Sequence, residues 1–241
     1  MKALAIPTLL YRCMTAQHRL GRSCLNIHIR ILRGAWHLRT ESRQWIKRAF
    51  DIAVSSIFLI LFSPLLAMIA LLIKLEDGGS VFFPQTRVGR FGQLFKMYKF
   101  RSMCPNAEAR LKEVLAQNRH KEGVTFKLKN DPRLTRVGKW LRRLSLDEFP
   151  QFYNVLRGDM SVVGPRPPVP REVARYSLAD RRRLAVKPGL TCLWQVRGRS
   201  EIDFSGQVKL DVEYIETQGF WADVKILIQT VPAVLSGKGA C

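Results

Sequence analysis

The sequence has few of the residues on which several common kinds of functional site depend. Its 241 residues include five cysteines, an odd number with no Cys-x-x-Cys pair, and four histidines. This composition argues against a disulfide framework and a zinc site, and it favours a reducing compartment. The chain also lacks the glycine-rich phosphate-binding loop, the dinucleotide-binding fingerprint, the zinc-protease motif and the serine-hydrolase elbow.

Acidic residues are scarce as well. The chain carries 40 Lys and Arg against 19 Asp and Glu, which gives a formal net charge of +21. Because 47% of the residues are hydrophobic, the chain is not a disordered polycation, and its length suffices for one or two domains. The excess of positive charge predicts an anionic partner, either nucleic acid, a phospholipid surface or a phosphorylated substrate.

One long apolar run, residues 52–73, contains no charge. As a helix it would be roughly 33 Å long, enough to cross a hydrocarbon core of about 30 Å. A buried core helix is the alternative, but such helices seldom run this long without a polar face. We therefore predict a segment in or on a membrane.

Two features bear on how this run meets a membrane. Ser63 and Pro64 lie in its middle, where proline removes a backbone hydrogen bond, so we predict a kink there, with the hydroxyl of Ser56 or Ser63 as partner for the freed carbonyl. Lys and Arg exceed the acids on both flanks, whereas an ordinary span has a less basic side to export. A helix that bends and returns to the same face and an ordinary span with a tolerated proline both remain open on these grounds.

The rest of the chain divides around this run. Residues 1–44 are rich in Arg and resemble a transit peptide or a surface-binding arm, although we favour a poorly ordered extension or an upstream start codon. Residues 45–75 form the membrane segment and residues 76–241 a polar domain. The sequence pattern of the polar domain predicts a compact α+β fold that is mainly helical, with a small β-hairpin formed by residues 80–84 and 93–98.

Helical periodicity and breakers complete this prediction. Helices are expected over 105–119, 135–144, 148–156 with an end at Gly158, and 171–184. Residues 163–170 contain four prolines and are expected to be irregular, and the apolar stretch 212–235 is expected to break at Gly219 and Pro232.

Residues 141–150 concentrate groups that suit phosphate and metal chemistry. Arg142 can clamp phosphate oxygens through two parallel hydrogen bonds. Asp147 or Glu148 can bind Mg²⁺, a hard cation that bridges phosphates, and a carboxylate can also attack phosphorus to form an acyl phosphate. The structural alternative is that Ser145 and Glu148 form a capping box, or that Asp147 caps the following helix.

Other arginines carry a similar ambiguity. Arg166, held between Pro165 and Pro167, either presents a fixed cation to a diphosphate or shapes a loop. Arg101 is a phosphate candidate whose default reading is a surface ion pair. The run 181–183 is a solvated helix face or a contact to anionic headgroups.

Several blocks between residues 45 and 240 resemble the bacterial sugar transferases that act on polyprenyl phosphate, the monotopic phosphoglycosyl transferases. The blocks are KRAFD (47–51), the apolar segment with its Ser-Pro pair, FGQLFKMYKFRSM (91–103), DPRLTRVG (131–138), LDEFPQFYNVLRGDMSVVGPRP (146–167) and KPGLTCLWQVRGR (187–199). The resemblance leaves 1–44 unmatched and lacks the extra transmembrane helices of larger members, so the chain is similar to the short form.

This resemblance implies a reaction and its residues. A sugar 1-phosphate moves from a nucleotide diphosphate sugar, usually UDP-linked, to undecaprenyl phosphate, with release of the nucleoside monophosphate and with Mg²⁺ as cofactor. Asp147 is implied as the nucleophile that forms a covalent phosphosugar enzyme, and Glu148 as its partner near Mg²⁺. Arg142 matches the phosphate-binding arginine, and Arg166 lies in the Pro-Arg-Pro motif near the nucleotide.

The resemblance also implies a place and a topology. The membrane helix is re-entrant and broken at Ser63–Pro64, which holds the active site on the cytoplasmic face of the bacterial inner membrane, at the first membrane step of exopolysaccharide, capsule or O-antigen synthesis. Cys192 departs from the glycine common in the family, and it would strain the loop if that position needs a positive φ.

We thus expect a UDP-sugar, undecaprenyl phosphate and membrane lipids as partners, a homodimer as an unsurprising state, and no nucleic acid. Two alternatives stay open: a membrane-tethered basic module that grips nucleic acid or anionic lipid, and an inactive family member that acts as a scaffold. Asp147→Asn separates the first alternative from the enzyme. A binding module should keep its binding or bind more strongly, whereas the enzyme should lose turnover.

Overall fold

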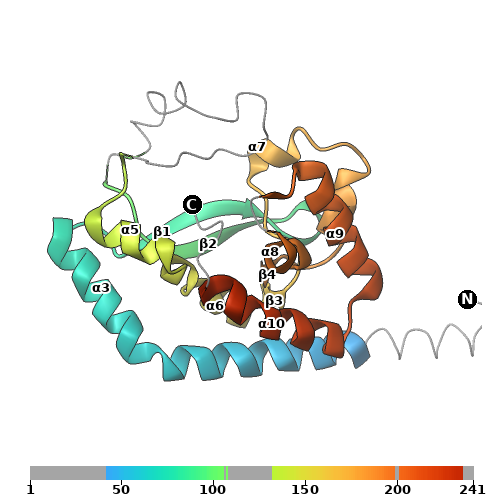
Figure 1. Ribbon diagram of the computed structural model, residues 1–241, viewed down its shortest axis with the longest axis horizontal. Helices are drawn as coiled ribbons and strands as arrows, with labels where there is room; N and C mark the ends of the chain where they lie inside the picture. The colour runs from blue at the N-terminus through green and yellow to red at the C-terminus, as the bar shows by residue number, and fades with distance from the viewer. Residues whose placement is uncertain (1–41, 106, 108–131, 199–200, 236–241) are drawn as a thin grey trace, which may run out of the picture. The chain divides into compact units, whose positions relative to one another are not determined.

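The computed structural model describes residues 42–105, 107, 132–198 and 201–235 (Figure 1). The chain separates into two compact units, 1–47 and 48–241, and the account below concerns the second unit together with the full length of its first helix. Nearly all of the extension 1–44 and most of the helix predicted over 105–119 lie outside the described residues.

The apolar segment forms two helices, Ser42–Leu61 and α3 (Ser63–Asp77), which meet with a bend of 62°. Pro64 stands in the first turn of α3, where its missing N–H breaks no helical hydrogen bond of α3. The carbonyl of Ile60, four residues before the proline, instead accepts a hydrogen bond from the hydroxyl of Ser63 at 2.8 Å. The predicted kink and its serine partner are both confirmed.

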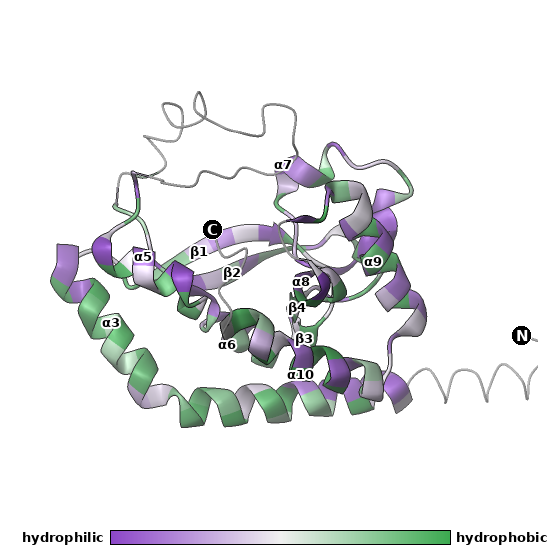
Figure 2. Ribbon diagram, in the orientation of Figure 1, coloured by the Kyte–Doolittle hydropathy of each residue, from purple (hydrophilic) through white to green (hydrophobic). Residues whose placement is uncertain are grey.

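Most residues of this bent pair are hydrophobic, as Figure 2 shows. In the described part of the chain no helix alone has the length and hydropathy of a membrane span, whereas the bent pair meets both criteria when taken together. Its most exposed large apolar side chains are Trp45, Ile57, Ile60, Leu61 and Leu75. On the opposite side, Ile69 and Ile73 are buried against Phe100 and Leu141.

The predicted hairpin is confirmed. Strand β1 (Phe82–Val88) pairs antiparallel with β2 (Leu94–Phe100), from Phe82 opposite Phe100 to Val88 opposite Leu94, around the short helix η1 (Arg90–Gly92). β1 runs further than the predicted strand 80–84 and takes in Arg87 and Val88. The extension has a tertiary cause, because the amide of Val88 donates to the carbonyl of Pro168 and the side chain of Arg87 donates to the carbonyl of Pro167.

Three short elements follow the hairpin. They are α5 (Arg136–Arg143), η2 (Leu146–Glu148) and α6 (Gln151–Arg157). Thr135 caps α5 by accepting a hydrogen bond from the amide of Gly138 at 2.9 Å. Gly158 ends α6 in the left-handed region, with φ 90°, as predicted.

A second small sheet was not predicted. Strand β3 (Ser161–Val163) pairs in parallel with β4 (Gly189–Thr191), so Val163 is not irregular. The approach is close, since a Cβ on Gly189 would lie 2.1 Å from the amide nitrogen of Gly164. Three-residue strands that depend on contact between distant glycines leave almost no periodic signal.

The carboxy-terminal part is helical. It contains α7 (Pro170–Val173), η3 (Asp180–Ala185), α8 (Leu193–Arg197), α9 (Phe204–Thr217) and α10 (Phe220–Leu235). The single helix predicted over 171–184 is wrong, because the amide and hydroxyl of Ser177 both donate to the carboxylate of Asp180 and form a turn there. The break near Gly219 is confirmed. Pro232 does not break α10, which continues for three residues beyond it.

The helix Ser42–Leu61 is tied to the polar domain from Arg48 onwards. Asp51 accepts hydrogen bonds from the hydroxyl of Ser161 at 2.9 Å and the amide of Val162 at 3.0 Å. Arg48 donates to the carbonyls of Val155 and Leu156 at the end of α6, at 2.5 and 2.6 Å. Besides the cluster of Ile69 and Ile73, the interior holds a second apolar cluster: Met97, Val155, Met160, Val162, Val163, Leu193, Tyr214 and Ile226.

Candidate active site

The adjacent carboxylates of Asp147 and Glu148 lie in η2, between α5 and α6. Ser145, with φ 56° and ψ 21°, turns the chain between α5 and η2 in a conformation that non-glycine residues rarely adopt. Ser145 makes no side-chain cap on η2, and α6 begins after Pro150, also without a side-chain cap. The capping alternatives for these acids are therefore wrong.

The two carboxylates have opposite environments. Asp147 is only 8% exposed, and burial raises its pKa to about 6, although the charges of Lys99 and Arg142 oppose this rise. Burial would also raise the pKa of Glu148, but the charges of Lys99, Arg166 and Arg87 outweigh it, so the pKa is lowered. Lys99 donates to Glu148 at 2.6 Å. The proton of the pair thus resides on Asp147 more readily than on Glu148.

Glu148 faces a small cleft in which cations are in excess. The residues that line it are Arg87, Met97, Lys99, Glu148, Gln151, Arg166, Pro167, Gly189, Leu190 and Gln195. Three cations, Arg87, Lys99 and Arg166, therefore share one cleft with a single carboxylate. Such a balance favours an anion with several oxygens, such as a diphosphate.

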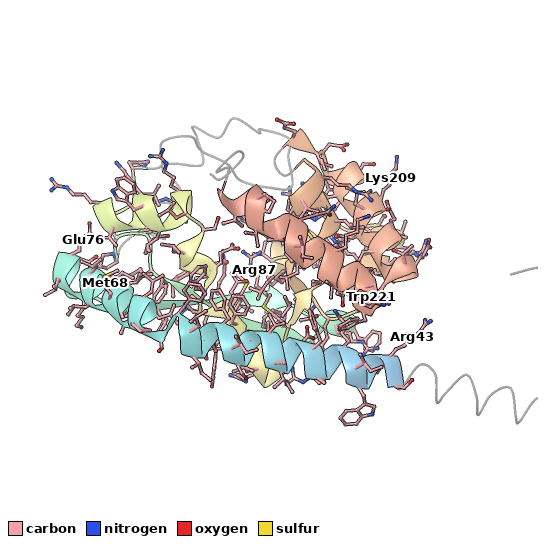
Figure 3. All side chains as sticks on the ribbon, turned by 60° about the horizontal axis from the view of Figure 1, so that its bottom comes forward. Arg43, Met68, Glu76, Arg87, Lys209 and Trp221 are labelled. Atoms are coloured by element: carbon pink, nitrogen blue, oxygen red, sulfur yellow. The ribbon has the colours of Figure 1, made fainter. Side chains whose placement is uncertain are left out.

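The cations are held in different ways. Arg87 lies among the side chains in the interior of the domain (Figure 3), donating to the carbonyl of Pro167 at 2.9 Å and to Gln85 at 2.6 and 3.1 Å. Burial, followed by the charge of Arg166, lowers the pKa of Arg87 to about 10, which leaves it cationic at neutral pH. Arg166 is exposed between the buried prolines Pro165 and Pro167, so its backbone is fixed while its side chain is accessible.

Arg142 and Arg101 do not line the cleft. Arg142 donates to the hydroxyl of Ser102 at 3.0 Å and lowers the pKa of Asp147 from its place on α5. Arg101 forms an ion pair with Asp77 at the end of α3, and the guanidinium is buried. The ion-pair alternative for Arg101 is confirmed, with a buried guanidinium and an exposed partner, Asp77.

Aromatic contacts hold the bend at Ser63–Pro64 close to the dyad. The rings of Phe58 and Phe62, just before the bend, contact the ring of Phe149 with centroids 4.8 and 6.0 Å apart, and Phe149 directly follows Glu148. Phe58 also stacks on Phe152 of α6 at 3.9 Å. The sequence-predicted kink and carboxylates are thus brought together.

The sequence analysis missed Lys99, Arg87, Gln151 and Gln195. A signal for two of them existed, because Met97 and Lys99 are two residues apart on β2 and Arg87 shares their face in the observed register. Gln151 and Gln195 had no such signal. Cys192 has a φ of −151°, which is extended backbone, so the position does not need a positive φ and that condition for strain is not met.

The donor set is compatible with Mg²⁺. Within the described ranges no three His, Cys, Asp or Glu side chains gather as a metal centre would require. Mg²⁺ is commonly held by one or two carboxylates and completes its shell with substrate phosphates and water. Glu148 supplies such a carboxylate in a cleft that suits phosphates, and Asp147 is its neighbour in η2, so the residue types fit this ion.

A buried carboxylate beside several cations is an arrangement suited to phosphoryl transfer, in which charge develops on phosphate oxygens. The sequence model described as bacterial sugar transferase matches residues 42–237. The chain belongs to this family of transferases, as its motifs indicated.

Relatives with high identity support the assignment. The chain is 52% identical over 166 residues to the galactosyl transferase CpsE of Streptococcus agalactiae, which covers 68% of this chain and 37% of the relative. It is 46% identical over 216 residues to an undecaprenyl-phosphate galactose phosphotransferase of Salmonella typhimurium, which covers 88% of this chain and 45% of the relative. It is 45% identical over 197 residues to the exopolysaccharide production protein ExoY of Rhizobium meliloti, which covers 80% of this chain and 87% of the relative. The chain thus spans less than half of the first two relatives and most of the third.

Proposed function

We propose that this protein transfers a sugar 1-phosphate from a UDP-sugar to undecaprenyl phosphate and releases UMP. The observation that carries the proposal is the cleft in which Lys99, Arg87 and Arg166 meet Glu148, the neighbour of Asp147 in the carboxylate dyad. The acceptor is supported by relatives named undecaprenyl-phosphate galactose and glucose phosphotransferases, from Salmonella typhimurium and Komagataeibacter xylinus. The donor is supported by a relative from Erwinia amylovora named UDP-galactose-lipid carrier transferase.

In the proposed mechanism Asp147 acts as the nucleophile. A carboxylate oxygen attacks the phosphorus that bears the sugar, the bond from that phosphorus to the bridging oxygen breaks, and UMP leaves with this oxygen. An oxygen of the lipid phosphate then attacks the same phosphorus and releases the carboxylate. Because burial raises the pKa of Asp147 to about 6, the carboxylate is more basic than an ordinary aspartate yet ionised at neutral pH.

The cations would stabilise charge on the diphosphate. Lys99 holds Glu148 at 2.6 Å, and the side chains of Arg87 and Arg166 enter the same cleft. A Mg²⁺ ion on the dyad would supply further positive charge at the phosphate oxygens. Arg142, fixed by Ser102, favours the ionised form of Asp147.

We also infer that the bent helix pair enters the cytoplasmic side of a bacterial inner membrane and returns to the same side. Its exposed apolar residues support this topology, and the aromatic contacts of Phe58 and Phe62 with Phe149 support a site near the membrane surface. A polar nucleotide sugar and a lipid-borne phosphate meet most readily at such an interface.

Activity is expected to rise with pH through an acid limb near pH 6. The ionised form of Asp147 is the reactive one, and its fraction grows as the pH passes the pKa of about 6 that burial produces. Initial rates of UMP release between about pH 5 and 8, at donor concentrations below KM, would give this limb. An acid limb near the ordinary aspartate value of about 4 would contradict the assignment.

The function is tested by measuring UMP release in detergent with Mg²⁺ and a panel of UDP-sugars, with and without undecaprenyl phosphate. We expect multiple turnovers only when the lipid phosphate is present, because without it the reaction stops at the covalent enzyme. Well-folded protein that releases no UMP with any donor would contradict the proposal.

A further inference from the structure

Besides its charged residues, the cleft presents two carboxamides from different helices. Gln151 comes from the first turn of α6 and Gln195 from α8, and both line the cleft with Glu148 and Arg166. Gln151 is only 3% exposed. In the described part of the chain its side-chain carboxamide has no hydrogen-bond partner, and neither has the side-chain amide nitrogen of Gln195.

Gln151 is almost fully buried, yet its unpaired carboxamide keeps contact with the open space of the cleft, which is an unusual place for such a group. A polar group that leaves water without gaining a hydrogen bond costs free energy, so most buried amides in proteins are satisfied. Gln151 could have been satisfied locally, as Asn154 is one turn later on the same helix, where it donates to the carbonyl of Lys96 and accepts from the amide of Tyr98. The contrast between these two carboxamides indicates that a ligand completes the hydrogen bonds of Gln151.

Gln195 is held in place by the side chain of Cys192. The thiol of Cys192 donates to the side-chain oxygen of Gln195 at 3.3 Å. Cys192 is 1% exposed, and burial raises the pKa of the thiol, so the proton is present at neutral pH. Because the oxygen of Gln195 already has a donor, its amide N–H groups are left as the end that binds a ligand.

We propose that Gln151 and Gln195 bind the hydroxyl groups of the donor sugar, and that Cys192 is a positioning residue that orients Gln195. The inference rests on the proposed function. The cations of the cleft bind phosphate, which all donors share, so they do not separate one sugar from another. A carboxamide both donates and accepts hydrogen bonds, as a hydroxyl does. Gln151 also stands three residues after Glu148, close to where the sugar-bearing phosphorus must lie.

Sites that hydrogen-bond a substrate hydroxyl discriminate strongly against analogues in which it is displaced. UDP-galactose and UDP-glucose differ in the orientation of one hydroxyl, so they are a suitable pair. We expect Gln195→Ala to lower kcat/KM roughly 5- to 10-fold for the preferred donor and by a smaller factor for the other donor. The ratio of the two kcat/KM values should therefore decrease. Cys192→Ala should act in the same direction, and Cys192→Ser should restore the preference, because a hydroxyl also donates.

The measurement combines turnover with binding. Affinities of UDP-galactose, UDP-glucose and UMP are determined by calorimetry on the full chain carrying Asp147→Asn, with and without Gln195→Ala, and kcat/KM is measured without Asp147→Asn. Gln229→Ala, an exposed glutamine on α10, is the matched control. We expect the Gln195 variant to change sugar preference in both assays, while UMP affinity and melting temperature stay unchanged.

Two results would overturn the inference. If UMP binding weakens by the same factor as sugar binding, the carboxamides recognise the nucleoside. If both donors weaken equally, they serve only to shape the cleft. Absence of turnover together with Gln195-dependent sugar preference in calorimetry would instead contradict the proposed function and leave the assignment of the carboxamides supported.

Discussion

Replacement of Asp147 by Asn is expected to abolish transfer, lowering kcat by about 1,000-fold or more. The amide has nearly the same shape as the carboxylate but cannot attack phosphorus. Because Asp147 is buried and its pKa is raised, removal of the charge relieves a cost of burial, so the variant should fold at least as well as the parent. UMP release and thermal melting, measured on the same preparation, separate lost chemistry from lost structure.

A matched control is Glu216→Gln, which removes an exposed acid from its surface pair with Arg182. This change should leave both activity and melting unchanged, because exposed pairs contribute little. In addition, the parent protein with UDP-sugar but no lipid should acquire the mass of a sugar phosphate, and Asp147→Asn should not. Transfer that survives in Asp147→Asn would refute the assignment of the nucleophile.

Lys99→Met is the second change with a large expected effect. Lys99 is the cation in direct contact with the dyad, and its charge opposes the rise in the pKa of Asp147. We expect kcat/KM to fall by about 100-fold, and the acid limb of the pH profile to move to higher pH, because the ionised form of Asp147 loses a stabilising charge. Initial rates across the pH range measure both effects.

Lys96→Met is a close control for this prediction. Lys96 is exposed on the opposite face of β2, so the same change in charge and size should leave the rate and the acid limb in place. Lys99→Arg keeps the charge and should recover part of the activity. An acid limb that stays in place in Lys99→Met would show that Lys99 does not act on the dyad.

Local rules predicted much of the fold. The hairpin follows from alternation around a glycine-bearing loop, the end of α6 from Gly158, and the bend from Ser63–Pro64, since each depends on residues within a few positions of one another. Local rules failed where distant contacts decide. The helix predicted over 171–184 gives way to the Ser177–Asp180 turn.

The candidate site shows the same division. Asp147 and Glu148 were identified from their place in the sequence, but the sequence left both a capping role and a chemical role open. The structure excludes the capping role, because neither η2 nor α6 has a side-chain cap. Arg101 had the chemistry of a phosphate ligand, yet Asp77 takes up its charge. A residue's type does not predict which partner its charge meets.

By itself the sequence determined the family, the bent apolar segment and the carboxylate pair, because motifs and local backbone preferences are properties of neighbouring residues. Only the tertiary structure decided that cations from β1, β2 and the proline-rich segment, and carboxamides from α6 and α8, line one cleft with Glu148. The physical reason is that strand pairing and the packing of helices join segments far apart in the chain, and the burial that raises the pKa of Asp147 arises only from that packing.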